Sequence, residues 1–137
     1  MTVKDYLRQY EEAERIVRQL TTEYKEEREK IDTIRSSLGD GTPHGGSISK
    51  QVEIRALRLI DKALELNQAK LDAIEIRQQI YNTIRKIPGN EGTVLYERYI
   101  QLHKWEDIAE TMHFSMRNIF HLHQKALALV EDCIVLQ

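Results

Sequence analysis

The sequence has little of what a disulfide-stabilised or membrane-spanning protein needs. Its 137 residues include one cysteine, Cys133, so no disulfide can form within the chain. No apolar run approaches the roughly 20 residues that cross a bilayer. The amino terminus carries charge from Lys4 onward, unlike a signal peptide. These absences predict a cytoplasmic protein that has no membrane partner.

Helix-breaking residues are also scarce. There are two prolines and six glycines, and one proline and four of the glycines lie in residues 37–49. Hydrophobic residues make up 41% of the chain and charged residues 31%. This composition predicts an all-α protein, in which residues 37–49 form a flexible loop between long helices.

The chain has no excess of positive charge. Its net charge is −2, and residues 90–137 carry four basic against seven acidic residues, a net charge of −3 with histidine neutral. Dedicated nucleic-acid binders are usually basic, and phosphate contacts supply most non-specific affinity. If this segment binds DNA, we expect a single copy to bind weakly.

The first long helix is predicted over residues 3–36 without interruption. Its apolar residues follow alternating steps of three and four, a heptad seam in which Glu27 is the one break. The seam comprises Tyr10, Ala13, Val17, Leu20, Tyr24, Ile31, Ile34 and Leu38.

A second long helix is predicted over residues 50–87, with Ser49 as its N-cap and Pro88-Gly89-Asn90 ending it. It carries two apolar stripes, wider together than one partner helix covers. One comprises Leu57, Ile60, Leu64, Leu71, Ile74 and Tyr81; the other comprises Ala56, Leu59, Ala63, Leu66, Ala73, Ile80, Ile84 and Ile87. We interpret residues 1–87 as an antiparallel helical hairpin with surface left for a second subunit or for the C-terminal unit.

Residues 88–137 are predicted to form a three-helix domain with helices at about 91–101, 104–112 and 116–134. The turn His113–Ser115 joins the last two, and Ser115 caps the third. This spacing is typical of a helix-turn-helix, which places its second helix in a DNA major groove. The residues expected to face inward are Val94, Leu95, Tyr99, Leu102, Trp105, Ile108, Ala109, Met112, Ile119, Leu122, Ala126, Leu129 and Val130.

Residues 94–130 resemble the C-terminal promoter-reading domain of bacterial sigma factors. The resemblance rests on Val94-Leu95, Arg98-Tyr99, Trp105 to Glu110, Ser115, Ile119 and Lys125 to Leu127. His113 stands where that family usually has glycine. Over nearly its full length, the chain resembles a phage-borne family of Gram-positive bacteria, some of whose relatives are ArpU- or RinA-type regulators of late phage genes. The resemblance implies a transcriptional regulator in the cytoplasm of a bacterial host.

The third C-terminal helix carries the candidate DNA-reading residues. Arg117, Asn118 and His121 are expected to face bases and Lys125 a phosphate. Lys104 is a second candidate phosphate contact. Ser115 and Met116, at the start of the third helix, are further candidate DNA-binding residues. Phe120 has three interpretations: contact with thymine methyl groups, with a partner subunit, or with another helix of its own chain.

Metal binding and catalysis are not expected. His121 and His123 are two residues apart on a helix, so they point to different faces, and Cys133 has no second cysteine to join it in a zinc site. No glycine-rich loop ends in the Gly-Lys-Ser/Thr of a phosphate cradle. The sequence therefore predicts a protein that is not an enzyme and has no cofactor.

Three functions remain open. The leading hypothesis is a DNA-binding regulator that dimerises through its long helices, with Glu27 and Asn67 as polar residues that fix register. The second is an adaptor that binds RNA polymerase or another phage protein. The third is a DNA-packaging subunit of the small-terminase kind, for which a ring-shaped oligomer is expected.

Overall fold

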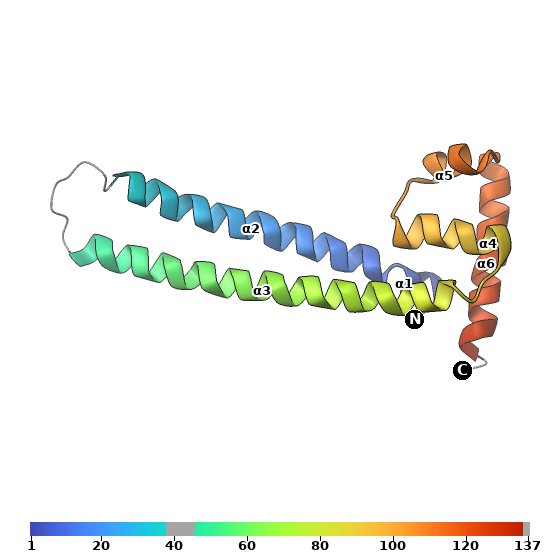
Figure 1. Cartoon of the computed structure of the whole chain (residues 1–137), viewed down its shortest axis with the longest axis horizontal. Helices are drawn as coiled ribbons and strands as arrows, with labels where there is room; N and C mark the ends of the chain where they lie inside the picture. Colours follow the sequence, from blue (N-terminus) through green and yellow to red (C-terminus); the bar gives the residue numbers. More distant parts are fainter. Residues whose placement is uncertain (38–45, 136–137) are drawn as a thin grey trace. The chain divides into compact units, whose positions relative to one another are not determined.

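A computed structural model describes residues 1–37 and 46–135, and every regular element in these residues is helical (Figure 1). The predicted all-α class is therefore confirmed. The elements are α1 (Val3–Leu7), α2 (Gln9–Ser37), α3 (Gly46–Ile84), α4 (Gly89–Leu95), the π-helical turn η1 (Tyr96–Ile100), α5 (Trp105–Met112) and α6 (Met116–Val135). No helix in the described residues is long and apolar enough to span a membrane.

The chain divides into two compact units, Met1–Ala13 with Ala73–Gln137, and Glu14–Asp72. The first unit contains residues from both sides of the boundary that we expected after Ile87. It does so because α1 contacts α6, and residues near the end of α3 share a core with the C-terminal helices.

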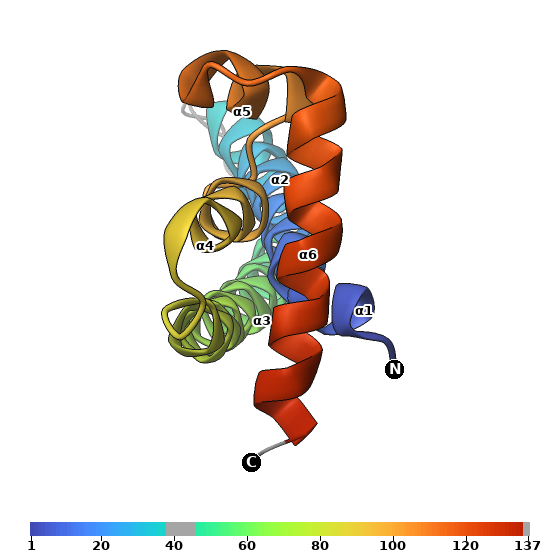
Figure 2. The same ribbon diagram turned by 90° about the vertical axis from the view of Figure 1, so that its right-hand side faces the viewer.

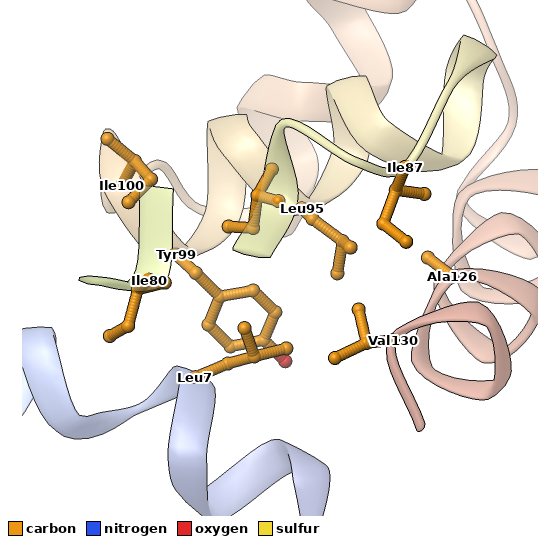
Figure 3. Close-up of a cluster of buried hydrophobic side chains, with 9 residues drawn as sticks. Leu7, Ile80, Ile87, Leu95, Tyr99, Ile100, Ala126 and Val130 are labelled. Atoms are coloured by element: carbon orange, nitrogen blue, oxygen red, sulfur yellow. The ribbon is translucent and has the colours of Figure 1, made fainter. Parts of the chain in front are cut away.

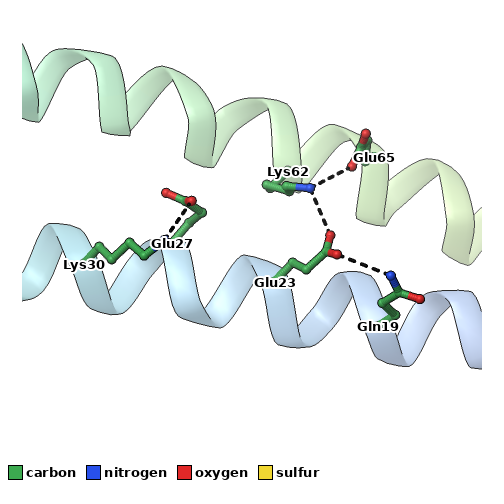
Figure 4. Close-up of polar contacts among 6 residues, drawn as sticks. All are labelled: Gln19, Glu23, Glu27, Lys30, Lys62 and Glu65. Atoms are coloured by element: carbon green, nitrogen blue, oxygen red, sulfur yellow. Dashed lines mark hydrogen bonds and ion pairs between the residues drawn. The ribbon is translucent and has the colours of Figure 1, made fainter.

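In the second unit, α2 and α3 lie side by side and run in opposite directions (Figure 4). A short ion pair, 2.9 Å from Lys62 Nζ to Glu23 Oε2, joins them, and this hydrogen bond lowers the pKa of Glu23. The predicted seam of α2 is its more buried face, with Val17, Leu20 and Tyr24 half-buried and Ile31 buried.

Glu27 is the polar residue in that seam. Its Oε1 lies 3.5 Å from Lys30 Nζ, whereas its Oε2 is buried without a hydrogen-bond partner (Figure 4). A buried acceptor without a partner loses its solvation and gains nothing in exchange. The buried Oε2 of Glu27 therefore lowers the stability of this unit.

The two apolar stripes of α3 have different surroundings. Leu66, Ala73, Ile80 and Ile84 of one stripe are buried, whereas Leu57, Ile60, Leu64, Leu71 and Ile74 of the other are exposed. The stripe from Leu57 to Ile74 is thus an apolar face that the described chain does not cover.

The first unit is held together by a hydrophobic cluster to which α1, α3, α4, η1 and α6 all contribute (Figure 3). Leu7 and Ile80 are fully buried in it, as is Leu95 of α4. Gly92 allows α4 to begin close to the end of α3, because a Cβ atom there would lie 2.0 Å from the carbonyl oxygen of Ile87. The cluster comprises Leu7, Ile80, Ile84, Ile87, Leu95, Tyr99, Ile100, Ala126 and Val130.

Several local predictions were wrong. The first helix is not continuous: α1 ends at Leu7, and Arg8 separates it from α2. The break accompanies the burial of Leu7 and a hydrogen bond, 3.0 Å, between the Tyr6 hydroxyl and Thr83 Oγ1. Tertiary contacts here override local helix propensity.

Ser49 is not the N-cap of the second long helix, because α3 begins at Gly46 and Ser49 lies inside its first turn. The bounds predicted for the loop 37–49 were wrong at both ends, since Ser37 and residues 46–49 are helical. Residues 38–45, with Leu38, lie outside the described residues. Local propensity is a weak guide to such boundaries. Leu129 is 39% exposed rather than inward-facing, because Ala126 and Val130, one turn apart on α6, occupy the inward positions.

Candidate nucleic-acid interface

A single left-handed residue begins the turn between α5 and α6. His113, the C-cap of α5, has the left-handed conformation, with φ 59° and ψ 38°. The Phe114 N–H donates to the Ala109 carbonyl at 3.0 Å. Glycine adopts this conformation without strain, whereas histidine adopts it at a cost. His113 therefore carries a backbone strain that a glycine at this position would not.

Ser115 is the N-cap of α6, as the sequence predicted. Its Oγ accepts the Asn118 N–H at 3.1 Å, and its carbonyl accepts the Ile119 N–H at 3.0 Å. The hydroxyl therefore satisfies one of the backbone donors left open at a helix start. The cap fixes the direction in which α6 leaves the turn.

A second hydrophobic cluster holds α5 against α6; the ribbons of these two helices are seen in Figure 2. Ile108 and Ile119 are fully buried in it, and Ala109 has no side chain beyond Cβ to keep the helices apart. Met112, Phe114 and Met116 pack partly buried around it. Because its inner face is used in this way, α6 turns its other face outward.

The outward face of α6 brings together most of the predicted DNA-reading residues. Arg117, Asn118, His121 and Lys125 are all exposed. A shallow depression on this face is lined by Ser115, Arg117, Asn118, Phe120, His121 and Gln124. Two predicted residues lie apart: Met116 packs against the second cluster, and exposed Lys104 lies at the N-cap of α5.

Trp105 organises an aromatic group at the edge of this face, which sequence reasoning missed. Its ring lies 5.4 Å from the Phe120 ring and 4.7 Å from the His123 ring, both edge-on, and the Arg98 guanidinium lies 4.7 Å from its centre. These distances fall in the range of favourable ring and cation–π contacts. Of the three interpretations of Phe120, contact with its own chain is therefore realised, although 44% of the residue remains exposed.

His123 is the buried polar residue of this unit, with an exposed fraction of 4%. Its Nε2 lies 2.7 Å from the Tyr99 hydroxyl. Burial, together with the positive charges of Lys4, Arg98 and Arg8, lowers the pKa of His123 from 6.5 to about 4. Burial also raises the pKa of Tyr99. His123 is thus a neutral hydrogen-bonding core residue at pH 7, and it faces away from exposed His121, as predicted.

The loop between η1 and α5 is held by polar contacts. The Arg98 guanidinium donates to the His103 carbonyl at 3.0 Å, and the His103 Nδ1 lies 2.6 Å from Glu97 Oε2. Lys104 follows directly, with its side chain exposed. The loop therefore presents a cation at a backbone position fixed by its neighbours.

α5 exposes acidic side chains beside the face of α6 that carries the candidate DNA-reading residues. Glu106, Asp107 and Glu110 are exposed on α5, and the first two suit the positive end of their helix dipole. Carboxylates near a DNA backbone repel phosphate. The exposed side chains of α6 include hydrogen-bond donors, but the neighbouring carboxylates of α5 would weaken any attraction to phosphate.

Among the residues that the structure describes, no group of three or more His, Cys, Asp or Glu side chains could hold a metal ion. Comparisons of the chain with protein families, with curated proteins and with solved structures found no match.

Proposed function

We propose that the chain is a DNA-binding transcriptional regulator in which a helical hairpin carries a sigma-like helix-turn-helix. The observation that supports this best is the exposed face of α6. It presents Arg117, Asn118 and His121 together, while Ile119 on the opposite side is buried against α5. A recognition helix needs this division between a reading face and a packing face.

Each exposed residue has a distinct role in the proposal. The Arg117 guanidinium donates two hydrogen bonds to guanine, and the Asn118 amide pairs with adenine. Lys104 and Lys125 contact phosphates, which position the helix without specifying sequence. The resemblance to phage-borne regulators suggests sites upstream of late phage genes, in the cytoplasm of a bacterial host.

The test begins by selecting bound duplexes from a randomised DNA library at about 50 mM salt, where phosphate contacts are strong. Fluorescence anisotropy of a selected duplex then gives the affinity as salt rises. We expect Arg117→Ala and Asn118→Ala each to weaken binding by about 5- to 150-fold, the loss of one bidentate base contact. Lys125→Ala should weaken all duplexes alike and make the log–log salt slope shallower by about 0.9.

Arg28→Ala is the matched control, since Arg28 is an exposed arginine of α2. It should leave affinity and salt slope unchanged. If the wild-type protein selects no duplex at low salt, or if Arg117→Ala behaves like Arg28→Ala, DNA reading by α6 is refuted.

A second function is favoured by the acidic surface of α5. Glu106, Asp107 and Glu110 would suit a basic surface on RNA polymerase or another phage protein, so that the helix-turn-helix serves as an adaptor. Direct binding to purified host RNA polymerase, lost in Glu110→Lys and retained in Arg117→Ala, would support this function over DNA reading.

A further inference from the structure

One face of α3 carries a heptad seam that the described chain leaves uncovered. Leu57, Ile60, Leu64, Leu71 and Ile74 are 63%, 55%, 62%, 61% and 65% exposed. Together with Asn67, they follow alternating steps of three and four residues, the spacing of positions a and d in a coiled coil. At 1.5 Å per residue this seam is about 26 Å long.

The seam is distinct from the face of α3 that is already buried. Leu66 and Ala73, the most buried residues of this part of the helix, lie about a quarter of a turn or more around the helix from the residues of the seam. A monomeric protein seldom exposes a continuous apolar surface of this size unless the surface binds something.

Asn67 indicates what binds there. It is exposed and stands at a d position between Leu64 and Leu71. In a parallel, in-register pair of helices, Asn67 of one copy faces Asn67 of the other, and the two amides can hydrogen-bond. In an antiparallel pair it would face leucine and lose its solvation without a partner. Single buried asparagines fix register in this way.

The flanking charges agree with the same arrangement. In a parallel pair, position g of one helix contacts position e of the next heptad on the other helix. On this seam these positions are Lys70 and Glu75, both exposed and of opposite charge. Two-fold symmetry forms the Lys70–Glu75 contact twice, whereas an antiparallel pair does not bring these residues together.

We propose that the exposed seam of α3 binds a second copy of this chain, parallel and in register. Leucine at the a positions with isoleucine at the d positions allows further copies to join the same bundle. The seam holds about two and a half heptads, so each interface is small, and we expect reversible self-association at micromolar concentrations. This inference does not depend on DNA binding, because it concerns only the surface of α3.

The experiment measures solution mass by analytical ultracentrifugation over a range of micromolar concentrations. The mass of the full-length chain should rise with concentration toward that of two to four chains. Leu64→Glu should remain monomeric, with at least about a ten-fold weaker association. Its far-ultraviolet circular dichroism should stay unchanged, since Leu64 is exposed. As a control, Ile16→Glu places a glutamate at an exposed position of α2, and this variant should still self-associate.

A charge exchange tests the orientation. Lys70→Glu and Glu75→Lys should each weaken self-association by about two- to ten-fold, and the double variant should restore it. In a Cys133→Ser background, Leu57→Cys and Asn67→Cys should each cross-link under oxidation, because equivalent positions of a parallel seam are within disulfide reach. Arg58→Cys, which lies next to the seam, should not.

A wild-type chain that stays monomeric, an oligomer of more than four chains, or an assembly that survives Leu64→Glu would overturn the proposal. A double charge variant that is no better than the single variants, or cross-linking at only one of the two seam positions, would overturn the parallel register. These results are separate from the DNA measurements, since Arg117→Ala should self-associate normally.

Discussion

His123 gives the fold a dependence on pH that can be worked out from its surroundings. In the folded chain its pKa is about 4, because the ring is buried beside Tyr99 and Trp105, whereas an exposed histidine titrates near its ordinary value of 6.5. The unfolded chain therefore binds the proton more readily than the folded chain. Stability is present above the unfolded pKa and is lost as pH falls from about 6.5 toward 4.

The size of the effect follows from the difference in pKa. A shift of one unit corresponds to about 1.4 kcal/mol. Linkage then predicts that His123 lowers the free energy of unfolding by about 2 kcal/mol between pH 7 and pH 5, and by about 3 kcal/mol at pH 4. This is a large fraction of the total stability of a small domain.

The assay is urea unfolding at a series of pH values for the wild type and His123→Gln. Carboxylates titrate in both proteins, so the difference between their unfolding free energies isolates the imidazole. We expect the wild type to be the more stable at pH 7 and its advantage to shrink by about 2 kcal/mol by pH 5. His121→Gln, an exposed neighbour, should follow the wild type. A wild-type advantage over His123→Gln that is constant with pH would refute the reasoning.

Three further substitutions test other parts of the fold by denaturant unfolding. Gly92→Ala should destabilise the chain by about 3 kcal/mol, because the new Cβ would collide with the Ile87 carbonyl; an unchanged midpoint would contradict this close approach. Glu27→Leu should stabilise it by about 1–2 kcal/mol by removing a buried carboxylate oxygen without a partner, whereas exposed Glu26→Leu should have little effect. His113→Gly should stabilise it by about 0.5–1 kcal/mol, the relief of left-handed strain less the added chain entropy, and a loss of stability would show that the histidine side chain contributes more than its strain costs.

Much of the candidate site could be predicted because its causes are local. The cap at Ser115 depends on residues within one turn, and the hydrogen bond from the Asn118 N–H confirms it. The outward position of Arg117 and Asn118 follows from the spacing of Ile119 and Leu122, whose burial fixes the opposite face. Helical periodicity carries this information directly.

The remaining features depend on segments far apart in the sequence. Arg8 interrupts the first helix where Leu7 is buried in a core shared with the C-terminal helices, and nothing near Arg8 encodes that core. The burial of His123 requires Tyr99 and Trp105, which come from other elements. Sequence spacing showed that His121 and His123 face different ways, but it did not show which of the two faces is enclosed.

The charge of the C-terminal segment connects the two proposals. Lys104 and Lys125 are the lysines of this segment, and two phosphate contacts give a salt slope of only about −1.8. Under the DNA-reading proposal, so little electrostatic attraction would leave Arg117 and Asn118 to discriminate between sequences, and the protein would need another source of affinity. A second copy bound through α3 would supply it, since two linked reading helices raise the effective concentration of the second at its site. If both proposals hold, self-association through the exposed seam of α3 would compensate for the weak positive charge of each C-terminal segment.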